Sequence, residues 1–350
     1  MKHALGEFGW NDWFTARFEP FAALGLRPAR VAIEHRSHYE LYSEAGPVSA
    51  VLAGKLRYSA IARTDLPAVG DWVAAAPRPE GEATIHGVVP RRSAFVRRAA
   101  GHVGQGQVAA ANIDVAFVVT SCNAEFNPRR LERYLGAAWE SGAEPVVLLT
   151  KADLAANVAD LAAAARAVAG SVPVIVVSAL TELGVEAVRT VLAGGRTGAM
   201  LGSSGVGKST LINRLLGEER LATASVRDSD DKGRHTTTRR ELVPVPGGGL
   251  LIDTPGMRQI EPHESGEGML RAFADVQALA LECSFADCRH GPEPGCAVTA
   301  AVADGRLTVV RRDAFQRLTA EQAHEHRKVD QRAGVATKPP RKHVTRKRGS

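Results

Sequence analysis

The order of two short motifs constrains the fold of this chain more than any other feature of its sequence. The segment GSSGVGKST, residues 202–210, follows an apolar stretch and opens a helical one. It matches GxxxxGK[ST], a loop whose backbone N–H groups and helix N-terminus surround phosphate. The segment TKAD, residues 150–153, matches a guanine-recognition loop, but it precedes the phosphate loop, whereas the usual order is the reverse. The sequence therefore predicts a nucleotide-binding domain whose chain has been cut and rejoined elsewhere.

Apolar stretches of strand length alternate with helical stretches around these motifs. The apolar stretches that precede the phosphate loop are DVAFVVTS, PVVLLT, VPVIVVSA and TGAMLG. Strands that are apolar throughout and each followed by a helix predict a parallel sheet covered on both faces. Residues 109–265 are therefore expected to form an α/β P-loop domain with circularly permuted connectivity.

The phosphate loop carries predictions for individual residues. Lys208 would neutralise the charge of the β- and γ-phosphates, and the hydroxyl of Ser209 would ligate Mg²⁺. Nucleotide contacts are expected from Gly202, Ser203, Ser204, Gly205, Val206, Gly207, Lys208, Ser209 and Thr210. The alternative is a Gly-rich helix cap without a ligand, which the flanking strand and helix disfavour.

A second phosphate-side element is LLIDTPG, residues 250–256. Asp253 ends an apolar stretch and would lie just outside the inner ligands of the metal, while the N–H of Gly256 could reach the γ-phosphate. The polar segment 229–241, between the two elements, is predicted to be a mobile switch loop. Its Thr237 or Thr238 would complete the Mg²⁺ ligands only when the γ-phosphate is present.

The choice of base depends on TKAD. Asp153 can accept hydrogen bonds from N1–H and N2–H₂ of guanine, whereas adenine would leave a buried carboxylate there unpaired. Lys151 would lay its aliphatic stem over the base. The later pair Ser178-Ala179 matches the SA motif, whose backbone caps guanine O6. Thr150 stands where this motif usually has Asn, so its hydroxyl can replace only some of the bonds of the amide.

One downstream segment imitates the guanine motif. RKVD, residues 327–330, has Lys and Asp at the same spacing and lies where the ordinary order would place them. It sits in a charged helical stretch with no apolar strand before it, so TKAD is preferred on context. An ATP-using P-loop enzyme, such as a kinase, is the alternative, and it would be indifferent to Asp153→Asn.

Residues 36–108 have the pattern of a small β-barrel. Short β-rich pieces alternate with turn residues and no long amphipathic helix interrupts them, which favours an OB-like barrel. Barrels of this kind often bind nucleic acid, and a basic cluster would flank this one, formed by Arg91, Arg92, Arg97 and Arg98. Residues 1–35 are expected to be an extension, in which Trp10 and Trp13 suggest a docking segment.

The chain becomes helical and polar after about residue 262, and its cysteines concentrate there. Cys283, Cys288, His290 and Cys296 form the pattern Cys-x4-Cys-x-His-x5-Cys. Three thiolates and one imidazole suit tetrahedral Zn²⁺ with no vacant position, which indicates a structural metal site in a helical module at 266–332. The alternative is free thiols. Cys122 is expected to be a buried residue at a strand end.

The net positive charge of the chain is concentrated at its C-terminal end. The formal net charge is +6, and from Arg327 onward nine Lys or Arg residues stand against one acid, Asp330. Residues 333–350 are therefore expected to be a disordered basic tail that contacts RNA, or one that only improves solubility. Neither a transmembrane run nor a signal peptide is evident, so we expect a cytoplasmic protein.

The order TKAD, SA, GSSGVGKS, HTTT, DTPG resembles that of a circularly permuted GTPase. With a barrel before it and the Cys/His cluster after it, the chain resembles the bacterial ribosome small-subunit-dependent GTPase A (RsgA) family. FVRRAAG and AANID, where the barrel meets the GTPase domain, belong to the match. The resemblance implies GTP hydrolysis stimulated by the small (30S) ribosomal subunit, a role in late subunit maturation, contact with its rRNA, and action as a monomer. A ribosome-binding placeholder with incidental hydrolysis is the alternative.

Hydrolysis requires an oriented water molecule. Many GTPases carry Gln just after DxxG, whereas this chain has Met257, which cannot orient water. His235 is the candidate replacement, and the resemblance supports it because the family motif GRHTTT assigns that role to this His. The alternative is a surface His that contacts RNA or nothing. Without a Gln, slow intrinsic turnover is expected, with acceleration by a partner that orders the switch.

Overall fold

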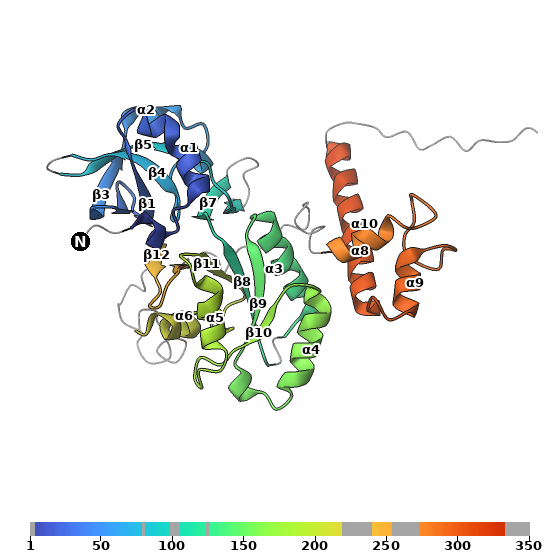
Figure 1. The fold of residues 1–350 in the computed structure, drawn as a ribbon. Coiled ribbons are helices and arrows are strands. Elements are labelled where there is room, and N and C mark those ends of the chain that lie inside the picture. The colour runs from blue at the N-terminus through green and yellow to red at the C-terminus, as the bar shows by residue number, and fades with distance from the viewer. Residues whose placement is uncertain are drawn as a thin grey trace, which may run out of the picture. The chain divides into compact units, whose positions relative to one another are not determined.

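The computed structural model describes residues 4–78, 81–98, 106–123, 126–218, 240–253 and 273–332 (Figure 1). The chain forms two compact units, Met1–Gln277 and Ala278–Ser350, each with its own packing. Within the described ranges, no helix combines the length and apolar character needed to cross a bilayer.

A five-stranded barrel begins the first unit. Its strands are β1 (Arg27–Glu34), β2 (Tyr39–Ser43), β3 (Gly46–Leu52), β4 (Trp72–Ala76) and β5 (Ala83–Val88). They follow the order β1-β2-β3-β5-β4, and pairing between β1 and β4 closes the ring. The alternation of side chains along β5 explains the core, because Ala83 and Ile85 are buried while His86 is exposed. The predicted OB-like barrel is confirmed; helix α2 (Gly54–Ser59) and the 3₁₀ turn η2 (Arg63–Asp65) lie between β3 and β4.

The N-terminal segment is part of this barrel. A 3₁₀ turn, η1 (Leu5–Phe8), precedes α1 (Asp12–Ala22), and the side chain of Asn11 caps α1 by accepting from the N–H of Trp13. The ring of Trp10 lies edge-on to buried Trp72 at 4.7 Å between centroids. These contacts make the segment part of the packing of the barrel, and the docking role expected from Trp10 and Trp13 stays a prediction. The predicted border at residue 36 also falls after the first strand, because closing the barrel requires β1.

A buried arginine, Arg30 of β1, connects the barrel to the segment between β7 and the strand that follows it. Two-stranded β6 (Ala94–Arg98) and β7 (Gly106–Ala111) form the connection. Arg30 is only 1% exposed and donates to the carbonyls of Phe8, Gly70 and Asn112. Burial lowers the pKa of Arg30 to about 10, although the nearby carboxylates of Asp114 and Asp71 oppose the shift. The guanidinium thus joins three backbone segments at one point.

A six-stranded sheet follows in the order β10-β9-β8-β11-β13-β12. Its strands are β8 (Val115–Ser121), β9 (Glu144–Thr150), β10 (Val174–Val176), β11 (Thr197–Leu201), β12 (Glu241–Pro244) and β13 (Leu250–Asp253). All neighbours are parallel except β12 and β13, which are antiparallel. A single bridge, Ile33 to Glu241, connects β12 to β1 and makes barrel and sheet continuous.

Helices cover both faces of this sheet, as predicted. They are α3 (Pro128–Glu140), α4 (Val158–Ala169), α5 (Val185–Leu192) and α6 (Lys208–Leu216), with a 3₁₀ turn η3 (Ala152–Leu154). Alternate residues of β8 point to opposite faces: Ala116 and Val118 share a core with α3 and α4, whereas Val115 and Phe117 share one with α5 and α6. Figure 1 shows the two helix pairs on either side of the strands.

The second unit is helical. It contains α9 (Ala297–Ala303) and α10 (Val309–Arg332), and α8 (Ala274–Ala280) spans the division between the units. Val298, Ala301, Phe315 and Leu318 are buried in it. RKVD at 327–330 lies inside α10 and does not follow a strand, which confirms that it is not a guanine loop. The predicted basic tail lies outside the described residues.

Candidate functional site

The phosphate loop lies between β11 and α6. Gly202 has φ +152°, and a Cβ there would overlap the carbonyl oxygen of Val119 on the neighbouring strand, so only glycine fits. Gly207 has φ +95° and caps α6 in the left-handed conformation. The loop therefore turns directly into the N-terminus of α6, where free N–H groups attract anions.

The lysine of the loop crosses it. The Nζ of Lys208 donates to the carbonyl of Gly202 at 2.6 Å and to that of Ser203. Ser209 and Thr210 follow in the first turn of α6, where a hydroxyl lies next to the loop. A cation and a hydroxyl at one helix N-terminus are the side chains needed to bind a phosphate–metal group.

The TKAD segment connects β9 to η3. Lys151 adopts φ +58°, a left-handed conformation that turns the chain sharply after the strand. The hydroxyl of buried Ser178 donates to Oδ1 of Asp153 at 2.5 Å and accepts from the N–H of Thr181 at 3.1 Å. Two motifs separated by 25 residues are thereby brought together. Asp153 itself is exposed, which corrects the buried carboxylate expected from the sequence.

Thr150 joins the TKAD segment to the phosphate loop. Its Oγ1 lies 2.5 Å from the carbonyl oxygen of Val206 and 3.0 Å from that of Thr120. A hydroxyl has one proton, so it donates to one of the two carbonyls at a time. Thr150 is 4% exposed. A Cβ added at Gly207 would lie 3.6 Å from the Oγ1 of Thr150, so the two residues are close neighbours. Thr150 therefore positions the phosphate loop, a role that its place in the TKAD segment did not predict.

Helix α3 contacts the phosphate loop from a second direction. Arg130 donates from Nη1 to the hydroxyl of Ser203 at 3.1 Å, and the hydroxyl of Tyr134 is 3.5 Å from the same oxygen. Sequence reasoning missed both residues. Their i,i+4 spacing places them on one helix face, but nothing local shows that this face meets the loop.

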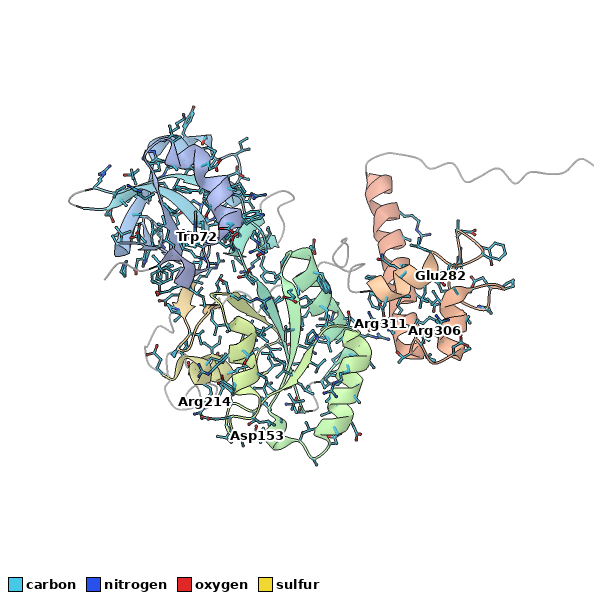
Figure 2. The ribbon with its side chains drawn as sticks, viewed as in Figure 1. Trp72, Asp153, Arg214, Glu282, Arg306 and Arg311 are labelled. Carbon is cyan, nitrogen blue, oxygen red and sulfur yellow. The ribbon has the colours of Figure 1, made fainter. Side chains whose placement is uncertain are left out.

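Helix α6 is tied to the SA motif by Arg214. Its Nε donates to the carbonyl of Ala179 at 2.9 Å, and its Nη1 lies 2.8 Å from Oε1 of Glu182. Figure 2 shows Arg214 and Asp153 at the same end of the sheet. The phosphate-side and base-side motifs are thus connected through Thr150 and again through Arg214.

The switch residues remain predictions. His235, Thr237, Thr238, Gly256 and Met257 lie outside the described residues, and Asp253 is described only as the last residue of β13. Its backbone partner in register is Glu241 of β12.

Arg240 lies near the end of the predicted switch loop and is the first residue of it that the structure describes, and the barrel and its hairpin hold it. Its Nη1 lies 3.9 Å from Oε2 of Glu34 and donates to the carbonyl of Val108 at 3.3 Å. Burial raises the pKa of Glu34, against the opposing effects of Arg240 and Arg63. The end of the switch loop is thus anchored to Glu34 of the barrel and to Val108 of the β6–β7 hairpin.

The predicted basic flank is partly used inside the protein. Arg91 forms two hydrogen bonds with the fully buried carboxylate of Asp71, at 2.8 and 2.7 Å. Arg92 pairs with Asp114 at 3.4 Å. Arg91 therefore has a structural role, and it is not a free cation for RNA, because its guanidinium also donates to the carbonyls of Thr64 and Leu66.

The four predicted metal ligands meet in the second unit. One donor atom from each of Cys283, Cys288, His290 and Cys296 lies within 4.8 Å of the others. The Sγ of Cys283 is 3.9 Å from that of Cys296 and 3.6 Å from Nδ1 of His290. Tetrahedral ligands at about 2.3 Å from an ion would be separated by just under 4 Å. The donor set therefore fits a metal ion with four protein ligands.

The cluster is supported by neighbouring donors. The N–H and hydroxyl of Thr299 donate to Sγ of Cys296 at 3.4 and 3.3 Å, and the N–H of His290 donates to Sγ of Cys288 at 3.4 Å. Burial opposes ionisation of Cys296, but the bonds from Thr299 and His290 outweigh it and lower the pKa of Cys296 to about 6. At least one thiolate is therefore available near neutral pH. Cys122, as predicted, is buried near a strand end.

Comparison with known proteins identifies relatives along most of the chain. Residues 88–263 match the family model described as RsgA GTPase. A protein of Opitutus terrae called small ribosomal subunit biogenesis GTPase RsgA is 46% identical, over 93% of this chain and 92% of the relative. A protein of the same name from Methanosarcina acetivorans is 43% identical, over 92% of this chain and 86% of the relative.

Solved structures match the fold as well. The crystal structure of YjeQ from Thermotoga maritima is similar with a TM-score of 0.66 and 25% identity, covering 85% of this chain and 99% of that one. YloQ, described as a circularly permuted GTPase, is similar with a TM-score of 0.62 and 22% identity, covering 86% and 96%. The cut and rejoined connectivity predicted from motif order is thereby confirmed.

Proposed function

Because the chain belongs to the RsgA GTPase family, we propose that it hydrolyses GTP to GDP and phosphate during late maturation of the small ribosomal subunit, which stimulates it. One observation in the structure supports this function independently of the family assignment. The base-side motif and the phosphate loop are joined by the hydrogen bond between Thr150 and Val206, so one nucleotide can span both. The carboxylate of Asp153, held by Ser178, supports a preference for guanine.

The proposed contacts divide between base and phosphates. Asp153 would accept from the guanine edge, Lys151 would cover the ring, and the backbone of Ser178 and Ala179 would cap O6. Because Asp153 is exposed, rejection of adenine depends on the base itself covering the carboxylate. The proposed phosphate contacts come from residues 202–210 and Gly256.

Mg²⁺, when bound, supplies positive charge that offsets the phosphates. Ser209 and either Thr237 or Thr238 would hold it, with Asp253 just outside them, and Lys208 would place its ammonium against the β/γ-phosphates. His235 would orient the attacking water in place of the usual Gln. An intrinsic rate limited by the position of this water is expected to be slow.

The nucleotide state would control binding to the subunit. A switch loop ordered by GTP would favour docking on rRNA, and hydrolysis would release the protein. Arg240 supports this coupling, because the end of that loop is fastened to Glu34 and Val108 of the barrel and its hairpin. We propose that a monomer acts in the cytoplasm, where subunits mature, and that the basic tail adds RNA contact.

The Cys/His cluster is proposed to hold one structural Zn²⁺. Thiolates and imidazole are the ligands that zinc prefers, and a set of four leaves no open position for catalysis. The close approach of Cys283, His290 and Cys296 supports this assignment. The metal would hold the connection that leads into α9.

Turnover measurements test the function directly. Phosphate release from GTP is measured with and without purified small subunits, beside the same measurements with ATP. We expect slow release from GTP alone, a large increase with subunits and little release from ATP. Equal rates with ATP and GTP, or GTP turnover that is indifferent to subunits, would contradict the proposal.

A further inference from the structure

The β1–β2 hairpin of the barrel places three potential metal ligands on one face. A tight turn at Arg36 and Ser37 joins the strands, and the N–H of His35 donates to the carbonyl of His38 at 2.9 Å. His35 and His38 are therefore opposite each other. Side chains alternate along a strand, so Glu40, two residues beyond His38, shares its face.

The donor atoms of these three residues are close together. Nε2 of His35 lies 2.8 Å from Oε1 of Glu40, and the rings of His35 and His38 stack with centroids 4.1 Å apart. One donor atom of each residue lies within 4.8 Å of the others. Ligands of a tetrahedral first-row ion are separated by about 3.3 Å. Small rotations of these partly exposed side chains would bring the donor atoms from their present separations to those that a bound ion requires.

We propose that His35, His38 and Glu40 form a second metal site, which takes a divalent first-row transition ion such as Zn²⁺, Co²⁺ or Ni²⁺. Two imidazoles and one carboxylate suit these ions, whereas Mg²⁺ and Ca²⁺ require oxygen ligands. Three protein ligands leave at least one position for water or an anion, in contrast to the closed Cys/His cluster.

The surroundings favour an anion at the open position. A cavity of about 390 Å³ adjoins the hairpin, and it is lined by His35, Arg36, Arg57 and Arg63 among others. A dication next to these arginines would be repelled unless negative charge accompanies it. The carboxylates of Glu34 and Glu40 supply part of this charge, and a phosphate or water-derived ligand would supply the rest.

Cobalt binding to the full-length chain tests the site. The Cys/His cluster is first loaded with one equivalent of Zn²⁺, and Co²⁺ is then titrated while its absorption is recorded. We expect one equivalent of Co²⁺ to bind with the visible bands of nitrogen and oxygen ligands and without thiolate-to-cobalt charge-transfer bands. His38→Gln and Glu40→Gln should each weaken this binding by about 10-fold or more.

A matched control separates this site from other histidines. His86 is exposed on β5 of the same barrel, so His86→Gln should leave cobalt binding unchanged. Thermal unfolding of His38→Gln should match the parent chain, because the substitution lies beside a surface turn. Failure to bind a second equivalent, thiolate bands in the added spectrum, or equal affinity in His38→Gln and the parent would each overturn the proposal.

Discussion

The hydroxyl of Thr150 reaches the carbonyl oxygen of Val206 at 2.5 Å, across 56 residues of sequence. Thr150 is the last residue of β9 and the first of the TKAD segment, and Val206 lies within the phosphate loop. In a permuted chain these motifs have exchanged their order, yet the hydrogen bond brings them into the same site. The relative position of the TKAD segment and the phosphate loop therefore depends in part on this bond.

Replacing Thr150 by Val should weaken GTP binding. The change keeps the shape of the side chain but leaves the carbonyl of Val206 without its donor, at a cost of about 1–2 kcal/mol. A 5- to 30-fold increase in Kd for GTP is expected by calorimetry. Thr150→Ser, which retains the hydroxyl, serves as the control and should bind almost normally. Unchanged affinity in Thr150→Val would refute the positioning role.

Asp153→Asn should exchange the preferred base. An amide can donate to the O2 of xanthine but cannot accept from both donors of guanine, so GTP should bind more weakly and XTP more tightly. Ser178→Ala removes the donor to Oδ1 and should weaken GTP binding by about 1 kcal/mol without favouring XTP. Competition binding with GTP, XTP and ATP measures both. Indifference of Asp153→Asn to base would favour an ATP-using enzyme.

Arg30→Met should destabilise the first unit strongly. The substitution removes the Arg30 donor to the buried carbonyls of Phe8 and Asn112, and one of two side-chain donors to that of Gly70. A loss of about 3 kcal/mol in the free energy of unfolding is therefore expected. Denaturant unfolding followed by tryptophan fluorescence measures it. Arg27→Met, at the exposed start of the same strand, is the matched control and should change stability little. Equal stability of the two variants would contradict the junction role of Arg30.

Glu34 should make stability depend on pH. Burial raises its pKa above the ordinary value of 4.5. The folded state then binds the proton more tightly than the unfolded state, so this group stabilises the fold fully below pH 4.5 and loses that effect as pH rises through the folded pKa. Glu34→Gln should flatten this part of the curve of unfolding free energy against pH. Glu44→Gln, at an exposed position, should leave the curve unchanged.

Metal removal should unfold the second unit selectively. Chelation or Cys288→Ser would leave the cluster incomplete, and α9 and α10 should lose protection from hydrogen exchange while the strands of the first unit keep theirs. Acidification should weaken metal binding as well, because the cysteine ligands must be deprotonated to bind the ion. Cys122→Ala provides a control that should retain the full metal content. Intact protection of α9 after chelation would contradict a structural metal.

The sequence was sufficient for elements with a strong local signal. The phosphate loop was recognisable because a tight backbone curl requires glycines at fixed spacing, as Gly202 and Gly207 show. The parallel sheet followed from apolar stretches separated by helices, and the Cys/His cluster from the spacing of its four residues. The order of the motifs was enough to predict the permutation, because order is a property of the sequence alone.

The tertiary structure decided what depends on packing between distant segments. The role of Thr150, the contacts of Arg130 and Tyr134 with Ser203, and the internal pairing of Arg91 each depend on where one element meets another. The inclusion of β1 in the barrel likewise depends on ring closure with β4. Periodicity and spacing report the local conformation of the backbone, whereas these contacts depend on the packing free energy of the whole fold, which no short pattern contains.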